Sequence, residues 1–269
     1  KPAREAAKAI CKQRYLELTY RVTDRYVIPM IETVKKLDPS LHILEIGSGE
    51  GGVIRAIVDR GHRGLGIELS PGRVALAKEF HQEVIRQGRL DFWSKNIYAI
   101  DPERDFDELF DVIVLKDVIE HIPDQERFIP WLKQYLKPGG VVFFGFPPWQ
   151  MPFGGHQQVL SNRWLSKWPY LHLMPWPWYR TLLRWGGESD GKIAGMKEVR
   201  DTGISIERFK HIVHASGMKL LAERHWLLNP VYESKFNLKA TGQAAFIRVI
   251  FLLRLSTLSL VCDESHQAG

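Results

Sequence analysis

Residues 41–52, LHILEIGSGEGG, form the stretch around which this chain is built. A short apolar run leads into three alternate glycines, Gly47, Gly49 and Gly51. Glycine has no Cβ atom, so it permits a tight turn and lets the backbone approach a ligand closely. Apolar residues at helical spacing follow up to Gly61, which places the glycines between a strand and a helix. Open α/β sheets bind ligands at such turns, outside the carboxyl ends of their strands.

The spacing of the glycines distinguishes this turn from the common phosphate-binding turns. Dinucleotide-binding turns read G-x-G-x-x-G and phosphate-binding loops read G-x-x-x-x-G-K-[ST], whereas this chain has Glu45-x-Gly47-x-Gly49-x-Gly51 and no lysine after it. An acidic residue at the strand end repels a phosphate and attracts an ammonium group. A second apolar run ends at Glu68, where a carboxylate can accept hydrogen bonds from both hydroxyls of a ribose. The turn is therefore not expected to hold a pyrophosphate.

With these residues the chain resembles the class I S-adenosylmethionine-dependent methyltransferases. Glu45 to Gly51 match the first motif of that family, E/D-x-G-x-G-x-G, and Glu68 matches its ribose-binding acid. The resemblance implies an α/β, Rossmann-like fold with a seven-stranded, mostly parallel sheet of order 3-2-1-4-5-7-6, whose last strand is antiparallel. It also implies S-adenosyl-L-methionine as cofactor. Solvated strand ends and an ordinary turn would explain either acid alone, but not the two acids together with this spacing.

Five strands with helices between them account for the parallel part of the sheet. They are expected near residues 41–46, 64–70, 90–97, 110–116 and 141–146. Family members usually end the third strand with an acid that accepts from the adenine amino group, and here Asn96 stands in that position, bringing no charge. Residues 117–121, DVIEH, resemble the fourth motif, beside the methionine part of the cofactor. The cofactor site implied by the resemblance comprises Glu45, Gly47, Ser48, Gly49, Gly51, Glu68, Leu69, Asn96, Ile97, Lys116 and Asp117.

Two histidines are candidates for catalysis, because an oxygen acceptor with a high pKa needs a base. His156 lies just after the fifth strand, where the resembled fold meets its substrate, and is the first choice. His121, in the fourth motif, is the second. A structural, hydrogen-bonded role is the alternative for each of them. The sequence shows no metal-ligand set, so no metal site is predicted.

Residues 147–204 depart from simple β-α repetition. They hold six of the nine tryptophans and six of the fifteen prolines. An aromatic insertion stiffened by proline suits a lid over an apolar substrate. The alternatives are a small hydrophobic subdomain packed on the sheet and peripheral contact with a membrane, since tryptophan is enriched at membrane interfaces.

The chain is expected to comprise four segments. Residues 1–40 form an N-terminal helical cap, 41–146 the Rossmann-like core that binds the cofactor, 147–204 the insertion, and 205–269 a helix with antiparallel strands that complete the sheet. Arg248 and Arg254 would lie inside the apolar stretch 244–262, so a helix followed by a strand is predicted there rather than a transmembrane span. Two cysteines give no disulfide framework, which indicates a reducing, cytoplasmic location.

Composition and missing motifs narrow the substrate class. The formal net charge is +6, but the basic residues of the N-terminal segment are dispersed as on solvated helix faces. The Asn-Pro-Pro-Tyr motif of many enzymes that methylate nucleobases is absent after the fourth strand, so no nucleic-acid partner is expected. We predict a methyltransferase acting on a small apolar or aromatic acceptor, most readily at oxygen.

Other functions fit the same residues. The alternatives are a non-catalytic protein that binds S-adenosylmethionine or S-adenosylhomocysteine, and a methyltransferase acting on nitrogen or carbon of a lipid-like substrate. A nicotinamide enzyme is disfavoured by the glycine spacing. The sequence assigns no oligomeric state.

Overall fold

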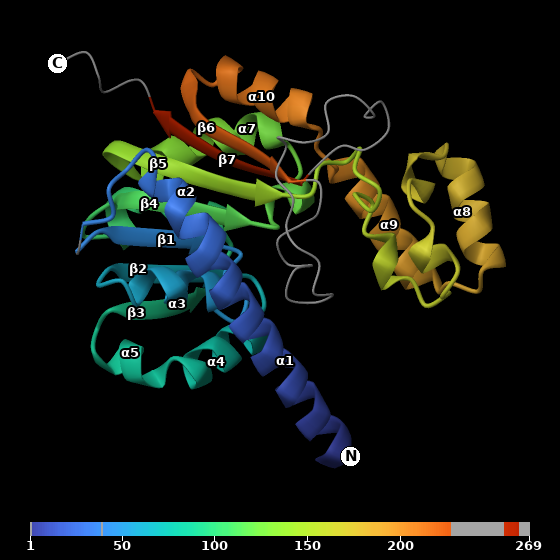
Figure 1. The fold of residues 1–269 in the computed structure, drawn as a ribbon, viewed down its shortest axis with the longest axis horizontal. Helices are drawn as coiled ribbons and strands as arrows, with labels where there is room; N and C mark the ends of the chain where they lie inside the picture. Colours follow the sequence, from blue (N-terminus) through green and yellow to red (C-terminus); the bar gives the residue numbers. More distant parts are fainter. Residues whose placement is uncertain (1, 39, 227–255, 264–269) are drawn as a thin grey trace.

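The computed structural model describes residues 2–38, 40–226 and 256–263, with side chains described from residue 12 to residue 225. Within these residues one seven-stranded sheet has the order β3-β2-β1-β4-β5-β7-β6 (Figure 1). The strands are β1 (His42–Ile46), β2 (Arg63–Glu68), β3 (Leu90–Ser94), β4 (Phe110–Lys116), β5 (Leu136–Phe146), β6 (Met218–Trp226) and β7 (Ser256–Asp263). The predicted parallel strands β1 to β5 and their order are confirmed. Strand β7 runs antiparallel to both β5 and β6.

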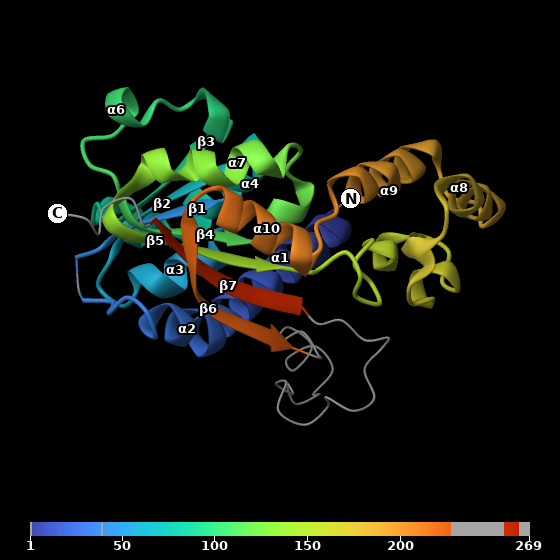
Figure 2. The same cartoon turned by 90° about the horizontal axis from the view of Figure 1, so that it is seen from above.

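Helices cover both faces of the sheet (Figure 2). On one face lie α2 (Ile28–Glu32) and α3 (Gly52–Val58), and on the other lie α7 (Gln125–Trp131) and α10 (Ile206–Ala215). Strand β4 is apolar on both sides, because Ile113 packs in the core under α7 and α10 while Val114 packs in the core under α2 and α3. Helices α4 (Pro71–Phe80) and α5 (Gln82–Arg86) pack beside β3 at one end of the sheet, with α6 (Pro102–Asp105) following β3 in the chain.

The N-terminal segment is nearly one continuous helix. Helix α1 (Pro2–Val22) passes through a π-helical turn, Thr23–Val27, into α2, which has Pro29 in its first turn. Proline has no N–H for the preceding turn, so the regular hydrogen-bond ladder is interrupted there, and π-helical geometry occurs mostly as such single turns inside α-helices. Thr19 and Leu16 of α1 lie so close to Gly52 that a Cβ atom there would meet them, which places α1 against the start of α3.

The insertion after β5 forms a helical lobe with its own core. It contains the short 3-10 turns Gln157–Val159, Leu165–Lys167 and Leu171–Leu173, then α8 (Trp176–Trp185) and α9 (Asp190–Thr202). Leu165, Tyr179, Leu183 and Met196 are among its buried core residues. Figures 1 and 2 show this lobe projecting away from the sheet. Its two ends meet where the Trp149 N–H donates to the carbonyl of Ile204, at 2.8 Å.

Some predicted boundaries are corrected by the structure. Strand β3 ends at Ser94, so Asn96 and Ile97 belong to the following turn and the 3-10 turn η2 (Ile97–Ala99). Strand β5 begins at Leu136, because this residue pairs with Phe110 ahead of a register shift. The prediction for residues 244–262 lies, up to residue 255, outside the described residues. Among the helices that are described, none has the length and apolar character needed to cross a membrane.

Candidate cofactor and active site

The three glycines of the first turn have left-handed backbone conformations. Their φ angles are 72°, 54° and 83° at Gly47, Gly49 and Gly51. The Gly47 and Ser48 N–H groups donate to the carbonyl of Ile67, at 2.8 and 3.1 Å, which ties the turn to the end of β2. A Cβ atom on Gly47 would lie 2.5 Å from a methyl of Val118, so the turn also lies against the residues that follow β4. The carboxyl ends of β1, β2 and β4 therefore meet at this turn.

Glu68 is held beside the glycine turn by two backbone N–H groups. Its Oε2 accepts from the Gly49 N–H and its Oε1 accepts from the Ser70 N–H, both at 3.0 Å. Only 8% of Glu68 is exposed. Arg73 of α4 approaches the same carboxylate, with Nη1 3.5 Å from Oε2. Arg73 was not predicted from the sequence, although it lies in the first helical turn after Glu68.

Glu45, at the end of β1, is almost fully buried. Its Oε2 accepts a hydrogen bond from the Ile54 N–H at 2.9 Å. Burial raises the pKa of Glu45 to about 8, against the opposing effects of this hydrogen bond and of Lys116. The Glu45 carboxyl group therefore retains its proton at neutral pH.

A cavity of about 170 Å³ connects these elements. The predicted residues that line it are Glu45, Gly47, Ser48, Lys116 and Asp117, and Tyr15, Thr19, Glu50, Gly52, Val53 and Arg73 line it as well. Tyr15 and Thr19 come from α1, which thus closes one side of the cavity. Lys116 Nζ lies 2.5 Å from a carboxylate oxygen of Asp117. Burial is the largest single effect and lowers the pKa of Lys116, but Asp117, Tyr15 and Glu45 together outweigh it and the pKa is raised.

Six of the predicted cofactor residues do not line this cavity, namely Gly49, Gly51, Glu68, Leu69, Asn96 and Ile97. Leu69 is exposed and Ile97 is part of the hydrophobic core. Asn96 is exposed, and its side-chain oxygen accepts from the Tyr98 N–H at 3.1 Å. The acceptor atom expected to meet adenine thus already caps the turn η2.

The two candidate catalytic histidines lie together. The ring centroids of His121 and His156 are 5.0 Å apart in an edge-to-face arrangement. His156 Nε2 lies 4.0 Å from Oε1 of Glu120, a buried carboxylate that was not predicted from the sequence. His121 and Glu120 come from the 3-10 turn η3 (Ile119–His121) after β4, and His156 comes from the start of the insertion. The Glu-His pair that follows β4 in the sequence could have identified Glu120 as a site residue.

Burial controls the protonation of this group. It lowers the pKa of His156 to about 4, with His121 adding to the effect, and it also lowers the pKa of His121 itself. Burial, followed by the Asp117 carboxylate, raises the pKa of Glu120. Both imidazoles are therefore neutral at neutral pH and can accept a proton or offer a nitrogen lone pair.

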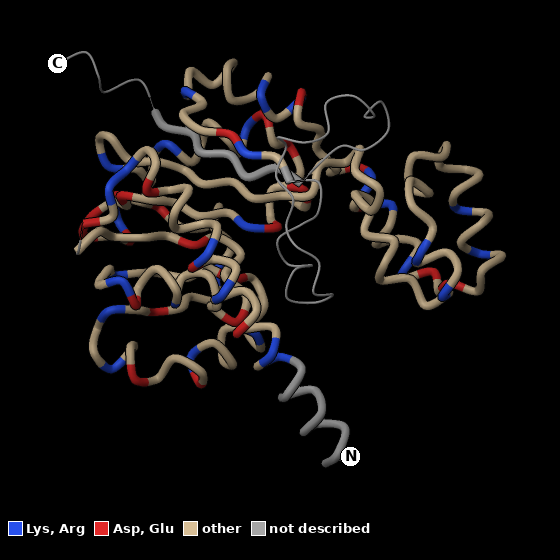
Figure 3. Tube along the Cα trace, in the orientation of Figure 1, with Lys and Arg blue, Asp and Glu red and all other residues tan. Residues whose placement is uncertain are grey.

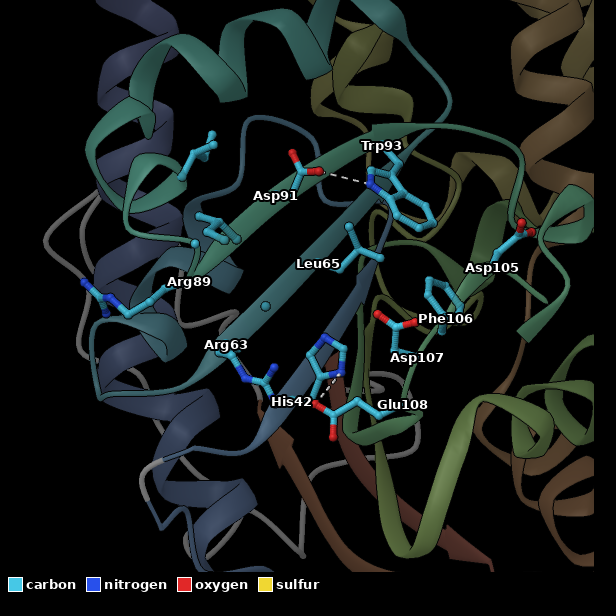
Figure 4. Close-up of a pocket in the computed structure, with 14 residues that line it drawn as sticks. His42, Arg63, Leu65, Arg89, Asp91, Trp93, Asp105, Phe106, Asp107 and Glu108 are labelled. Atoms are coloured by element: carbon cyan, nitrogen blue, oxygen red, sulfur yellow. Dashed lines mark hydrogen bonds and ion pairs between the residues drawn. The ribbon is translucent and has the colours of Figure 1, made fainter. Parts of the chain in front are cut away.

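A larger cavity, of about 490 Å³, lies at the opposite ends of the strands from the glycine turn (Figure 4). Residues at the amino ends of β1, β2 and β3 line it, including His42, Arg63 and Leu90. None of the predicted cofactor or catalytic residues belongs to it. Parallel sheets bind their ligands at the carboxyl ends of the strands, so the smaller cavity is the candidate site.

Comparison with known proteins identifies the family. Residues 18–186, more than half of the chain, match the family model of a methyltransferase domain. The chain belongs to the class I S-adenosylmethionine-dependent methyltransferases. Membership assigns S-adenosylmethionine to this methyltransferase as its cofactor.

Individual relatives of the methyltransferase are distant. The ubiquinone biosynthesis O-methyltransferase of Pasteurella multocida is 30% identical over 129 residues, which are 44% of this chain and 53% of the relative. The enzyme of the same description from Leptothrix cholodnii is 27% identical over 203 residues, covering 73% of this chain and 75% of the relative. The chain thus spans only about half of the Pasteurella relative.

A solved structure with the same fold is magnesium protoporphyrin IX methyltransferase from Synechocystis with bound S-adenosylhomocysteine. It aligns with a TM-score of 0.54 at 16% identity, covering 93% of this chain and 86% of that one. At this identity the likeness shows a shared fold.

Proposed function

We propose that this methyltransferase transfers the methyl group of S-adenosylmethionine to an oxygen of a small apolar or aromatic acceptor. The observation that carries the proposal is that Asp117, which lines the cavity with Glu45 and Lys116, acts electrostatically on the neighbouring imidazoles of His121 and His156. The reaction is an in-line displacement: an O–CH₃ bond forms as the S–CH₃ bond breaks, and the hydroxyl proton passes to a base. The protein has to align the two reactants and exclude water.

The cofactor would be held by the turns at the strand ends. Glu68 would accept from the ribose hydroxyls, while Gly49 lets the backbone approach the nucleoside closely. Glu45 would meet the ammonium group of the methionine part in the cavity, beside Lys116 and Asp117. Leu69, Asn96 and Ile97 would border the adenine. The predicted N-terminal cap, residues 1–40, would cover the cofactor, which the positions of Tyr15 and Thr19 in the cavity wall support.

His156 is our first candidate for the base and His121 the second. Each neutral imidazole has a nitrogen that can take the hydroxyl proton at neutral pH. Gly47 touches Val118 in the turn that carries His121, so these rings would lie close to the methionine part of the cofactor. The two relatives described as O-methyltransferases support oxygen as the methylated atom.

The insertion, residues 147–204, supports an apolar acceptor. Its Trp164 and Trp185 are 86% and 91% exposed, and Trp168 and Trp178 are also exposed. In the sequence, residues 127–187 contain no Asp or Glu, while Arg163, Lys167, Arg180 and Arg184 stand among the tryptophans. Figure 3 shows basic positions along the lobe together with some acidic ones. We propose that the lobe acts as a lid and that its tryptophans and cations contact an anionic membrane surface, from which a lipid-like acceptor would enter. Residues 205–269 would complete the sheet behind it.

The first experiment is calorimetric titration with S-adenosylmethionine and S-adenosylhomocysteine. We expect micromolar binding, roughly −8 kcal/mol. Glu68→Gln should weaken it at least tenfold, whereas Glu79→Gln, at an exposed position of α4, should leave it unchanged. The second step incubates the protein with phenolic and lipid-phenol acceptors and locates the new methyl group by mass spectrometry.

The outcomes separate the candidate functions. Methyl ethers formed from phenolic acceptors would support the proposal. Tight cofactor binding without methylation of any acceptor would indicate a non-catalytic binding protein, and methylation at nitrogen or carbon would refute the oxygen assignment. A folded protein that binds neither ligand would refute the cofactor site itself.

A further inference from the structure

Glu120 is a buried acid whose side chain has no hydrogen-bond partner. It is 2% exposed, and within the described structure neither carboxyl oxygen receives a hydrogen bond. Buried polar groups are nearly always satisfied, because an unpaired one loses its hydration without compensation. The Glu120 backbone is firmly held, since the Thr202 hydroxyl donates to its carbonyl at 2.6 Å. The unsatisfied carboxyl group is therefore built into the junction between the sheet and the insertion.

Two imidazoles face this carboxyl group. One ligand atom each from Glu120, His121 and His156 can be chosen so that all three lie within 4.8 Å of one another. The Glu120 oxygen and His156 Nε2 are 4.0 Å apart. Ligands of a four-coordinate zinc ion lie about 3.3 to 3.5 Å apart when each is ~2.1 Å from the metal. His121 is only partly buried, so small side-chain movements would bring the three atoms to this spacing.

The backbone of His156 has an unusual conformation. Its φ is 56°, in the left-handed region that non-glycine residues seldom adopt. The segment is confined, because a Cβ atom on the preceding Gly155 would lie 2.2 Å from Cβ of His172. The His156 N–H donates to the carbonyl of Phe153 at 3.0 Å. Such strained positions occur at ligand-binding sites, where the surrounding structure holds a side chain in a required direction.

We propose that Glu120, His121 and His156 bind a divalent first-row transition metal ion of the zinc type. Two imidazoles and one carboxylate are the donor set of several catalytic zinc sites, which leave a coordination position for water or substrate. The open position would face the side on which His121 is exposed. The metal site stands independently of the reaction, whereas its catalytic consequence rests on the proposed function.

The consequence for methyl transfer is activation of the acceptor oxygen. A hydroxyl bound to the divalent ion loses its proton more readily, as metal-bound water does. With the metal bound, His121 and His156 act as its ligands and not as the base, so the proton leaves to solvent. The oxygen attacks the methyl carbon, and the S–CH₃ bond breaks to give neutral S-adenosylhomocysteine. The metal keeps its oxidation state, so no further reactant is required.

The test is a Co²⁺ titration of the tag-free protein, followed by visible absorption and by equilibrium dialysis for stoichiometry. His211 and His214 are exposed one turn apart on α10 and could bind Co²⁺ by themselves. The double variant His211→Gln/His214→Gln therefore serves as the parent. We expect this parent to bind one Co²⁺ per chain, and Glu120→Gln, His121→Asn and His156→Asn each to weaken binding at least tenfold. Asparagine suits position 156 because it tolerates positive φ.

Two results would overturn the proposal. They are the absence of bound Co²⁺ in the parent, and equal Co²⁺ binding by the parent and the Glu120 and His156 variants. If Glu120→Gln does not fold by circular dichroism, His121→Asn at its exposed position decides the matter. Titration with S-adenosylhomocysteine runs in parallel: binding of that ligand without Co²⁺ refutes the metal site alone, and binding of Co²⁺ without that ligand refutes the cofactor site alone.

Discussion

The guanidinium group of Arg73 lies directly over the backbone of Gly49. A Cβ atom built on Gly49 would stand 2.2 Å from Nη2 of Arg73. The same guanidinium pairs with Glu50, with Nη2 3.0 Å from Oε2. It thus covers the place where, on the proposed function, a nucleoside held by Glu68 would approach the glycine turn, so we expect Arg73 to move when the cofactor binds.

We expect Arg73→Ala to bind S-adenosylhomocysteine as tightly as the parent protein or up to about fivefold more tightly. The Arg73 side chain is 43% exposed, so its ion pairs are worth at most about 1 kcal/mol, which is about fivefold in Kd. Isothermal titration calorimetry measures the change. A loss of affinity would show instead that Arg73 is a ligand of the cofactor.

Glu45 should make the stability of the protein depend on pH. Its pKa is about 8 in the folded state against 4.5 in the unfolded chain, so between these values the folded state binds more protons. The free energy of unfolding therefore falls as pH rises from about 4.5 to 8, by at most about 1.4 kcal/mol per pH unit. Glu45→Gln removes this contribution. As pH rises over that range, the unfolding free energy of the variant should therefore increase relative to that of the parent. Urea unfolding at several pH values tests it, with Glu79→Gln as control.

Cofactor binding should release a proton from Glu45. An ammonium group beside the carboxylate favours its charged form, so at pH 7 a carboxyl group with a pKa of about 8 would lose about one proton on binding. Calorimetric titrations in phosphate and in Tris buffer give the number of protons released. The parent protein should release a proton and Glu45→Gln should not; equal proton release by both proteins would contradict the assignment.

Gly51→Ala should destabilise the fold more than Gly88→Ala. Both residues have positive φ, 83° and 69°, so each substitution introduces left-handed strain of about 1–2 kcal/mol. A Cβ atom at Gly51 would also lie 2.5 Å from the Phe92 ring, whereas at Gly88 it would meet nothing within 4 Å. Overpacking should add roughly 1–3 kcal/mol at Gly51 only. Equal losses in urea unfolding would mean that the Phe92 ring moves aside freely.

Trp164 and Trp185 should mediate binding to anionic membranes. We expect the parent protein to sediment with vesicles containing phosphatidylglycerol and to bind phosphatidylcholine vesicles weakly. The double variant Trp164→Ala/Trp185→Ala should lose at least about tenfold in affinity for the anionic vesicles, because two indole rings no longer leave water. Unchanged sedimentation of the variant would remove the support for membrane contact.

The cofactor turn could be predicted because its geometry is local. The spacing from Glu45 to Gly51 and the position of Glu68 at a strand end depend on the strand-turn-helix sequence alone, and the structure places these residues at adjoining strand ends. Asn96 was harder to place, because β3 ends at Ser94 and the side chain caps the next turn.

The parts of the site that could not be predicted from the sequence depend on packing between distant segments. Thr19 reaches the cavity because α1 crosses the start of α3, and Glu120 meets His156 because the insertion returns to the sheet. Helical periodicity says which residues of a segment share a face, but not which element that face will contact. The sequence predicted no metal site, and the three side chains proposed here as metal ligands do not form a recognisable set in it, since His156 is remote in sequence from the Glu-His pair.

The lobe after β5 is stabilised by its own core and joins the sheet through a narrow neck, where Trp149 meets Ile204 and Thr202 meets the carbonyl of Glu120. It therefore has the character of an exchangeable module. A chimera that replaces residues 157–198 and retains both chain segments of the neck should keep the cofactor site intact. It should change which acceptors are accommodated. Acceptor range and cofactor binding would then be separable properties of one chain, open to independent variation in evolution and in the laboratory.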